Sequence, residues 1–139
     1  MTDTALTLAL DRYDRHFPFF DGSLPLPDGL DLTVLQVGEA SRLRDGTHRH
    51  GRMLRDGEFG AAEVSMSSYL MAVARGLPFT AVPIFPRRLF SQTQMFVNGN
   101  AGIESPDQLA GRRVGLQSFQ TTLAVLAKGD LATVYGVDL

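Results

Sequence analysis

The sequence of 139 residues contains no cysteine and no long apolar run. Disulfides, thiolate nucleophiles and cysteine-ligated zinc or iron–sulfur sites are therefore excluded. No segment approaches the roughly 20 apolar residues of a membrane-spanning helix, so we expect no membrane insertion. The first residues lack the basic segment of a signal peptide. We therefore expect a cytoplasmic protein, or a periplasmic one if a leader has been removed.

The chain also lacks an excess of charge of one sign. Its formal net charge is -2 and its pI is near 5.8, so nothing favours nucleic acid or an anionic membrane as a partner, and any anion site must be local. A basic run at residues 42–55 is interrupted by acidic residues, and we interpret it as a solvated helix face. Lys128 is the only lysine. Arginine suits two-point carboxylate binding, although genome composition could also explain this bias.

Metal-binding and phosphate-binding patterns are sparse as well. The three histidines are His16, His48 and His50. The last two are two positions apart, which places them on different faces of a helix, and zinc normally takes three or four protein ligands. The segment GNAG at residues 99–102 lacks the spacing of a phosphate-binding loop. We expect no metal and no cofactor.

What is present is an alternation of short apolar segments with helical patterns, which is typical of an α/β protein with a largely parallel or mixed sheet. The pattern predicts strands at residues 6–10, 30–37, 59–64, 79–85 and 113–116, and an extended stretch at 92–97. It predicts helices or helical turns at 11–20, 39–56, 69–75, 105–111 and 121–135. Three prolines within residues 17–28 exclude a long helix there.

The most informative segment is GEFGAAEVSMSSYL at residues 57–70, where an apolar strand leads into a cluster of hydroxyl residues and then a helix. A helix start presents unsatisfied N–H groups and the positive end of the helix dipole, which together favour an anion. Ser65, Ser67 and Ser68 are suited to such a site, or they are simply helix caps. Residues 117–122, which include Gln117 and Thr121, repeat the arrangement.

An arginine pair and a glutamate have alternative interpretations. Arg87 and Arg88 follow a predicted strand, and they could clamp a carboxylate or be solvated surface residues. Glu63 lies in an apolar strand, where a carboxylate is costly unless it is paired. It could be a tuned acid or base, or it could stand at the exposed end of the strand.

Five segments, LTLALDRYDR, RMLRDGEF, AAEVSMSSYLMAVARG, TAVPIFPRRLF and SPDQLAGRRVGLQSFQTT, together resemble the 4,5-dihydroxyphthalate decarboxylase family. That family is similar in turn to type II periplasmic solute-binding proteins. The resemblance implies an α/β fold of the type II periplasmic-binding-protein kind. Residues 1–91 would form the first lobe, residues 92–104 a crossover strand and linker, and residues 105–139 the start of a second lobe. Family members are longer, so most of the second lobe is expected to be missing, and the segment at residues 42–51 departs from the family pattern.

The resemblance also implies a ligand, a small aromatic or organic carboxylate held between two lobes. Ser67, Ser68, Gln117 and Thr121 would bind carboxylates, and Arg88 would orient one of them. Glu63 or Tyr13 would handle a proton in a decarboxylation that releases CO2. The alternative is a substrate-binding component of an ABC-type importer, with the same cleft and no chemistry. Assembly into a homo-oligomer stays open.

Overall fold

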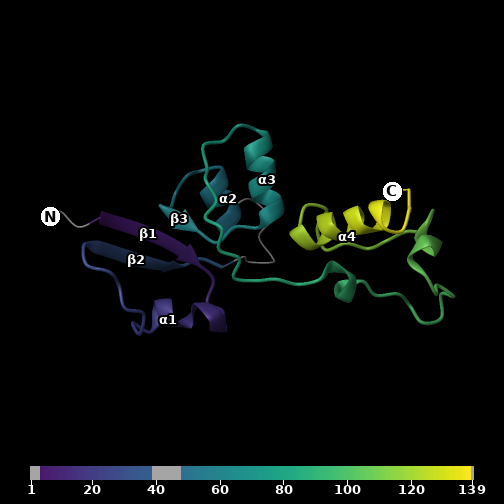
Figure 1. Ribbon diagram of the computed structural model, residues 1–139, viewed down its shortest axis with the longest axis horizontal. Helices are drawn as coiled ribbons and strands as arrows, with labels where there is room; N and C mark the ends of the chain where they lie inside the picture. Colours follow the sequence, from purple (N-terminus) through teal and green to yellow (C-terminus); the bar gives the residue numbers. More distant parts are fainter. Residues whose placement is uncertain (1–3, 39–47, 139) are drawn as a thin grey trace. The chain divides into compact units, whose positions relative to one another are not determined.

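The computed structural model describes residues 4–38 and 48–138 (Figure 1). The chain divides into two units, Met1–Val82 and Pro83–Leu139. The first unit contains a sheet, whereas the described part of the second contains helical elements only. The predicted division into lobes at residue 91 stays a prediction.

The sheet of the first unit has three parallel strands in the order β2-β1-β3. Strand β1 is Thr4–Leu10, β2 is Leu30–Gln36 and β3 is Ala61–Ala62. β1 pairs along its whole length with β2, from Thr4 opposite Leu30 to Leu10 opposite Gln36. The predicted strands at 6–10 and 30–37 are confirmed. Of the strand predicted at 59–64, only the two residues of β3 form a strand. A mixed α/β fold with a parallel sheet is therefore confirmed, while the periplasmic-binding-protein type stays a prediction.

The core of this unit lies around the central strand. Ala9, Val37 and Phe59 are buried together, and Met53 from helix α2 (Arg49–Leu54) is among the residues that pack against them. Gly60 lets the chain approach β1 closely, since a Cβ there would come within 2.7 Å of a methyl carbon of Leu6. Burial of these apolar groups fixes the order of the strands and the position of their carboxyl ends.

The remaining helical elements of the first unit are η1 (Asp14–His16), α1 (Phe17–Phe20) and α3 (Met66–Ala74). In Figure 1, α1 lies below the sheet, and α2 and α3 lie above it. The predicted helical turn at 11–20 and the helix at 69–75 are confirmed. Gly76 follows α3 with a positive φ of 68°, as expected of a helix stop. Of the helix predicted at 39–56, α2 confirms the later part, and residues 39–47 lie outside the described ranges.

The second unit contains η2 (Ser91–Gln94), η3 (Pro106–Leu109) and α4 (Thr122–Thr133). The predicted helices at 105–111 and 121–135 are confirmed, the first as a 3-10 turn. In η3 the side-chain oxygen of Gln108 accepts hydrogen bonds from the backbone N–H groups of Glu104 and Ser105, at 2.7 and 3.4 Å, as the capping pattern SPDQ predicts.

The strands predicted at 79–85 and 113–116 are wrong. The extended stretch predicted at 92–97 is wrong for residues 92–94, where η2 forms, whereas Met95 is extended. An apolar segment becomes a strand only when its backbone finds a partner. Pro83 and Pro86 lack N–H donors. Around η2, the side chains of Ser91 and Gln92 donate to the carboxylate of Asp130 in α4, which favours a local turn. No helix in the described ranges is long and apolar enough to cross a membrane.

Candidate functional site

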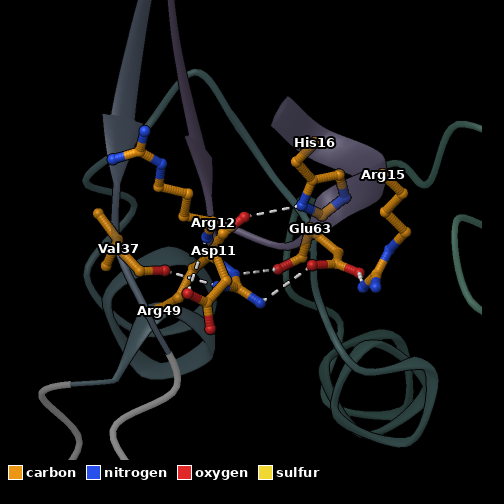
Figure 2. Close-up of polar contacts among 7 residues, drawn as sticks. All are labelled: Asp11, Arg12, Arg15, His16, Val37, Arg49 and Glu63. Atoms are coloured by element: carbon orange, nitrogen blue, oxygen red, sulfur yellow. Dashed lines mark hydrogen bonds and ion pairs between the residues drawn. The ribbon is translucent and has the colours of Figure 1, made fainter. Parts of the chain in front are cut away.

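The carboxyl ends of the three strands bring polar groups to one edge of the sheet. Asp11 directly follows β1, Val37 directly follows β2, and Glu63 directly follows β3. Because the strands are parallel, these ends meet at the same edge, which is where open α/β sheets usually bind their ligands. Figure 2 shows the side chains that gather there.

Arg49 is the centre of this arrangement. It belongs to α2, and only 2% of the residue is exposed. Its guanidinium donates from Nη1 to the backbone oxygen of Val37 at 2.5 Å and from Nε to the backbone oxygen of Glu63 at 2.7 Å. A third donor, Nη2, lies 3.2 Å from the carboxylate oxygen Oε2 of Glu63. Arg49 thus ties the end of β2 to the end of β3.

Glu63 has a second arginine on its other side. The Nη2 atom of Arg15 lies 3.0 Å from Oε1 of Glu63, and Figure 2 shows Arg15 and Arg49 reaching the carboxylate from opposite directions. The side chain of Glu63 is 17% exposed, and that of Arg15 is 31% exposed. Glu63 is therefore a paired carboxylate at the edge of the sheet. Its predicted part in proton transfer stays a prediction.

Tyr13 and His16 lie in the turn that follows β1. The ring of Tyr13 is 5.7 Å from that of His16, and the guanidinium carbon of Arg15 lies 4.3 Å from the centre of the tyrosine ring. Burial raises the pKa of Tyr13, and the neighbouring Asp11 carboxylate raises the same pKa further by charge and by hydrogen bonding. Tyr13, Arg15 and Glu63 thus form a continuous group of contacts.

His16 is 4% exposed, and its Nδ1 lies 2.8 Å from the backbone oxygen of Asp11. Its other ring nitrogen, Nε2, is also buried. Among the buried side-chain nitrogen and oxygen atoms of residues 4–38 and 48–138, it alone has no hydrogen-bond partner. Among the same residues, no three potential metal ligands come together.

The start of α3 continues the edge of the sheet beyond Glu63. Ser65 occupies the N-cap position, but its side chain makes no capping bond, and its hydroxyl lies 2.9 Å from that of Ser67. Ser67 is 5% exposed and Ser68 is half-buried, both in the first turn of α3. The alternative interpretation of these serines as helix caps is thus confirmed for the position of Ser65, but its side chain makes no capping bond. The serine hydroxyls contact each other beside the N–H groups of the helix start.

The other predicted binding residues belong to the second unit. Thr121 is the N-cap of α4, and its hydroxyl oxygen accepts from the backbone N–H of Ala124 at 3.2 Å. Gln117 is exposed in the preceding turn, and Arg88 is exposed with its guanidinium carbon 5.5 Å from the ring centre of Phe85. The predicted pairing of Gln117 and Thr121 with the serines of α3 across a cleft stays a prediction.

Three residues of the site were not among the predicted site residues: Arg15, His16 and Arg49. Arg49 was expected on a solvated helix face, and this is wrong, because its guanidinium is buried against two strand ends. The signal that points to it is Glu63, since a carboxylate in an apolar segment needs a buried cationic partner. Sequence spacing alone does not say which of the arginines is that partner.

No family model matches the chain. Over 99% of its length, however, it is 34% identical to a 4,5-dihydroxyphthalate decarboxylase of Comamonas testosteroni. It is 32% identical, again over 99% of its length, to a 4,5-dihydroxyphthalate decarboxylase of Pseudomonas putida. The chain spans 39% of the first protein and 50% of the second. The predicted resemblance to this decarboxylase family is thereby confirmed.

Proposed function

We propose that the chain binds an aromatic dicarboxylate and takes part in its decarboxylation, with 4,5-dihydroxyphthalate as the first candidate substrate. The observation that carries this proposal is the similarity to two proteins named as 4,5-dihydroxyphthalate decarboxylases, which extends over 99% of the chain. Similarity spread over so much of the chain favours a shared architecture and a shared kind of ligand.

The edge of the sheet has chemistry that suits such a ligand. A dianionic aromatic acid needs cationic groups and N–H donors for its carboxylates. Arg15 is partly exposed beside Glu63, and the N–H groups and hydroxyls at the start of α3 follow Glu63 directly along the chain. Decarboxylation further needs a proton for the ring carbon that loses CO2, in a site shielded from water.

In the proposed arrangement the chain forms a first lobe and the beginning of a second lobe of a periplasmic-binding-protein-like fold. Ser67 and Ser68 would bind one carboxylate of the ligand, with Gln117 and Thr121 binding the other from the second lobe. Arg88 would orient the ligand. The proton-handling residue would be Tyr13 or Glu63, and Tyr13 is the more available of the two because both carboxylate oxygens of Glu63 have arginine partners.

A direct assay tests the proposal. The 139-residue chain is incubated with 4,5-dihydroxyphthalate, and CO2 release is measured alongside ligand affinity by calorimetry. Release of CO2 supports decarboxylation by this chain. Absence of both binding and release contradicts the proposal.

The serine positions are tested in the same experiment. We expect the double variant Ser67→Ala with Ser68→Ala to bind the dicarboxylate about tenfold more weakly, because two hydroxyl donors are lost. The exposed Ser23 provides a control, and Ser23→Ala should leave the affinity unchanged. Equal affinity of the double variant and the control would remove both serines from the ligand shell.

The second candidate function is a non-catalytic substrate-binding component of an importer. The observation in its favour is that Glu63, the carboxylate at this edge, is held by Arg15 and Arg49, which suits a structural role better than proton transfer. Calorimetric binding of aromatic carboxylates with no CO2 release would favour this candidate. Cell fractionation would separate the proposed cytoplasmic location from a periplasmic one, and sedimentation would test for a homo-oligomer.

A further inference from the structure

The ring nitrogen Nε2 of His16 is a buried polar atom with no partner in the described part of the chain. A buried nitrogen that makes no hydrogen bond costs free energy, and such atoms in folded proteins call for an explanation. No aspect of the fold described above requires this nitrogen. The bond from Nδ1 to the backbone oxygen of Asp11 explains one ring nitrogen of this histidine but not the other.

The contact made by Nδ1 shows which of the two ring nitrogens carries the hydrogen in the neutral form of His16. Nδ1 lies 2.8 Å from the backbone oxygen of Asp11, and a backbone carbonyl only accepts hydrogen bonds. Nδ1 must therefore carry a hydrogen. In the neutral ring this leaves Nε2 as a bare acceptor, so that His16 is oriented with its basic nitrogen away from the backbone.

The surroundings of His16 contain both buried and exposed groups. Glu63 and the buried Arg49 are held by their mutual ion pair, and Asp11 is fixed by the end of β1. Tyr13 and Arg15 lie at the surface, and they contact each other beside the histidine ring. Figure 2 shows Nδ1 turned towards Asp11 and the second ring nitrogen turned towards the side of Arg15. Because Nε2 is buried, a ligand that contacts it must displace the exposed side chains beside the ring, Tyr13 and Arg15.

We propose that His16 is a catalytic residue whose Nε2 accepts a hydrogen bond, and then the proton, from a ring hydroxyl of the ligand. This role rests on the proposed function, because it requires a hydroxylated aromatic acid. In 4,5-dihydroxyphthalate each hydroxyl is para to one carboxylate-bearing carbon. A base at the hydroxyl therefore directs electrons to the carbon from which CO2 leaves.

The O–H bond of the hydroxyl breaks, its proton passes to Nε2, and its electron pair enters the ring. The para carbon forms a C–H bond with a proton that the proton-handling residue passes on from a water molecule, and the hydroxide left by that water goes to the solvent. The bond from that carbon to the carboxylate then breaks, CO2 leaves, and the electron pair of that bond restores the aromatic ring. The oxygen regains its proton from Nε2, so the net change replaces one carboxylate by one hydrogen.

The substitution His16→Asn separates this role from a structural one. The side-chain amide of asparagine places an N–H donor near the position of Nδ1, so the bond to the backbone oxygen of Asp11 can persist, whereas nothing replaces Nε2. The ligands are 4,5-dihydroxyphthalate and phthalate, which carry the same carboxylates but differ in their hydroxyls. Calorimetry measures the affinity of both ligands for the wild-type chain and the variant.

We expect His16→Asn to weaken the binding of 4,5-dihydroxyphthalate about tenfold, the effect of one lost hydrogen bond, and to leave phthalate affinity unchanged. The ultraviolet spectrum should show phenolate character in 4,5-dihydroxyphthalate bound to the wild-type chain only. An equal loss for both ligands, or no loss for either, overturns the role of His16 while leaving the proposed function intact. If the wild-type chain binds neither ligand, the proposed function and this role fail together.

A measurement on the wild-type chain covers the case in which the variant does not fold. Nitrogen-15 NMR of labelled histidine reports the hydrogen on each ring nitrogen. The Nδ1 signal of His16 should be that of a protonated nitrogen with and without ligand. The Nε2 signal should change when 4,5-dihydroxyphthalate is added and stay constant with phthalate. Equal shifts with the two ligands contradict the proposal.

Discussion

Replacing Arg49 by methionine tests whether the buried guanidinium holds the carboxyl edge of the sheet together. Methionine keeps most of the length and apolar stem of arginine but removes all its hydrogen-bond donors. The variant therefore loses the bonds to the backbone oxygens of Val37 and Glu63, and the ion pair with the Glu63 carboxylate. The packing of α2 against the sheet is largely kept.

The expected magnitude follows from the burial of these groups. Removing one partner of a buried ion pair costs about 3–5 kcal/mol, and a hydrogen bond from a charged donor contributes about 1.5–3 kcal/mol. Glu63 keeps Arg15 and has a 17% exposed side chain, so solvent and the second arginine compensate part of the loss. We therefore expect the free energy of unfolding to fall by about 3 kcal/mol, the lower end of that range.

Urea unfolding followed by circular dichroism measures this change. With a slope of about 1.5 kcal/mol per M, the midpoint should fall by about 2 M. Arg55→Met is the matched control, since Arg55 terminates the same helix and bonds to the adjacent Asp56 with a 61% exposed side chain. The control should unfold at the wild-type midpoint. Equal midpoints for the two variants would refute the assigned role of Arg49.

A second substitution separates the lost hydrogen bonds from the unpaired charge. Adding Glu63→Gln to Arg49→Met removes the carboxylate that the first change leaves without its buried partner. We expect the double variant to be more stable than Arg49→Met alone, because an uncompensated charge costs more than a neutral amide. A double variant that is less stable than the single one would contradict this account.

Two further predictions concern the second unit and the pH dependence. Thr121→Ala should destabilise α4 by about 1 kcal/mol, because the N–H of Ala124 loses its cap; helix unfolding measured against the exposed control Thr133→Ala checks this. Because the pKa of Tyr13 is raised above its ordinary value of 10.0, its contribution to stability is full below pH 10.0 and is lost as the pH rises through the folded-state pKa. Phenolate absorbance should show one tyrosine titrating late, and Tyr13→Phe should remove that component; unchanged late titration in the variant would contradict the assignment.

Local patterns in the sequence predicted the elements whose stability is local. The strands at 6–10 and 30–37 follow from apolar spacing, the helix at 69–75 from its glycine stop, and the helix at 121–135 from its capping residue Thr121. The apolar segments at 79–85 and 113–116 were also predicted as strands, and there the prediction was wrong. The difference is that β1 has neighbours on both sides, whereas residues 79–85 and 113–116 pair with no strand in the described ranges.

By itself the sequence determined the α/β class of the first unit, the family resemblance and the presence of a costly carboxylate at Glu63. Only the tertiary structure decided that Arg49 is its buried partner and that Arg15 shares it. It also showed that one ring nitrogen of His16 has no partner among the described residues. These residues are up to 48 positions apart in the chain. Their meeting depends on strand order and on the burial of α2 against the sheet, because long-range contacts are set by packing and not by local spacing.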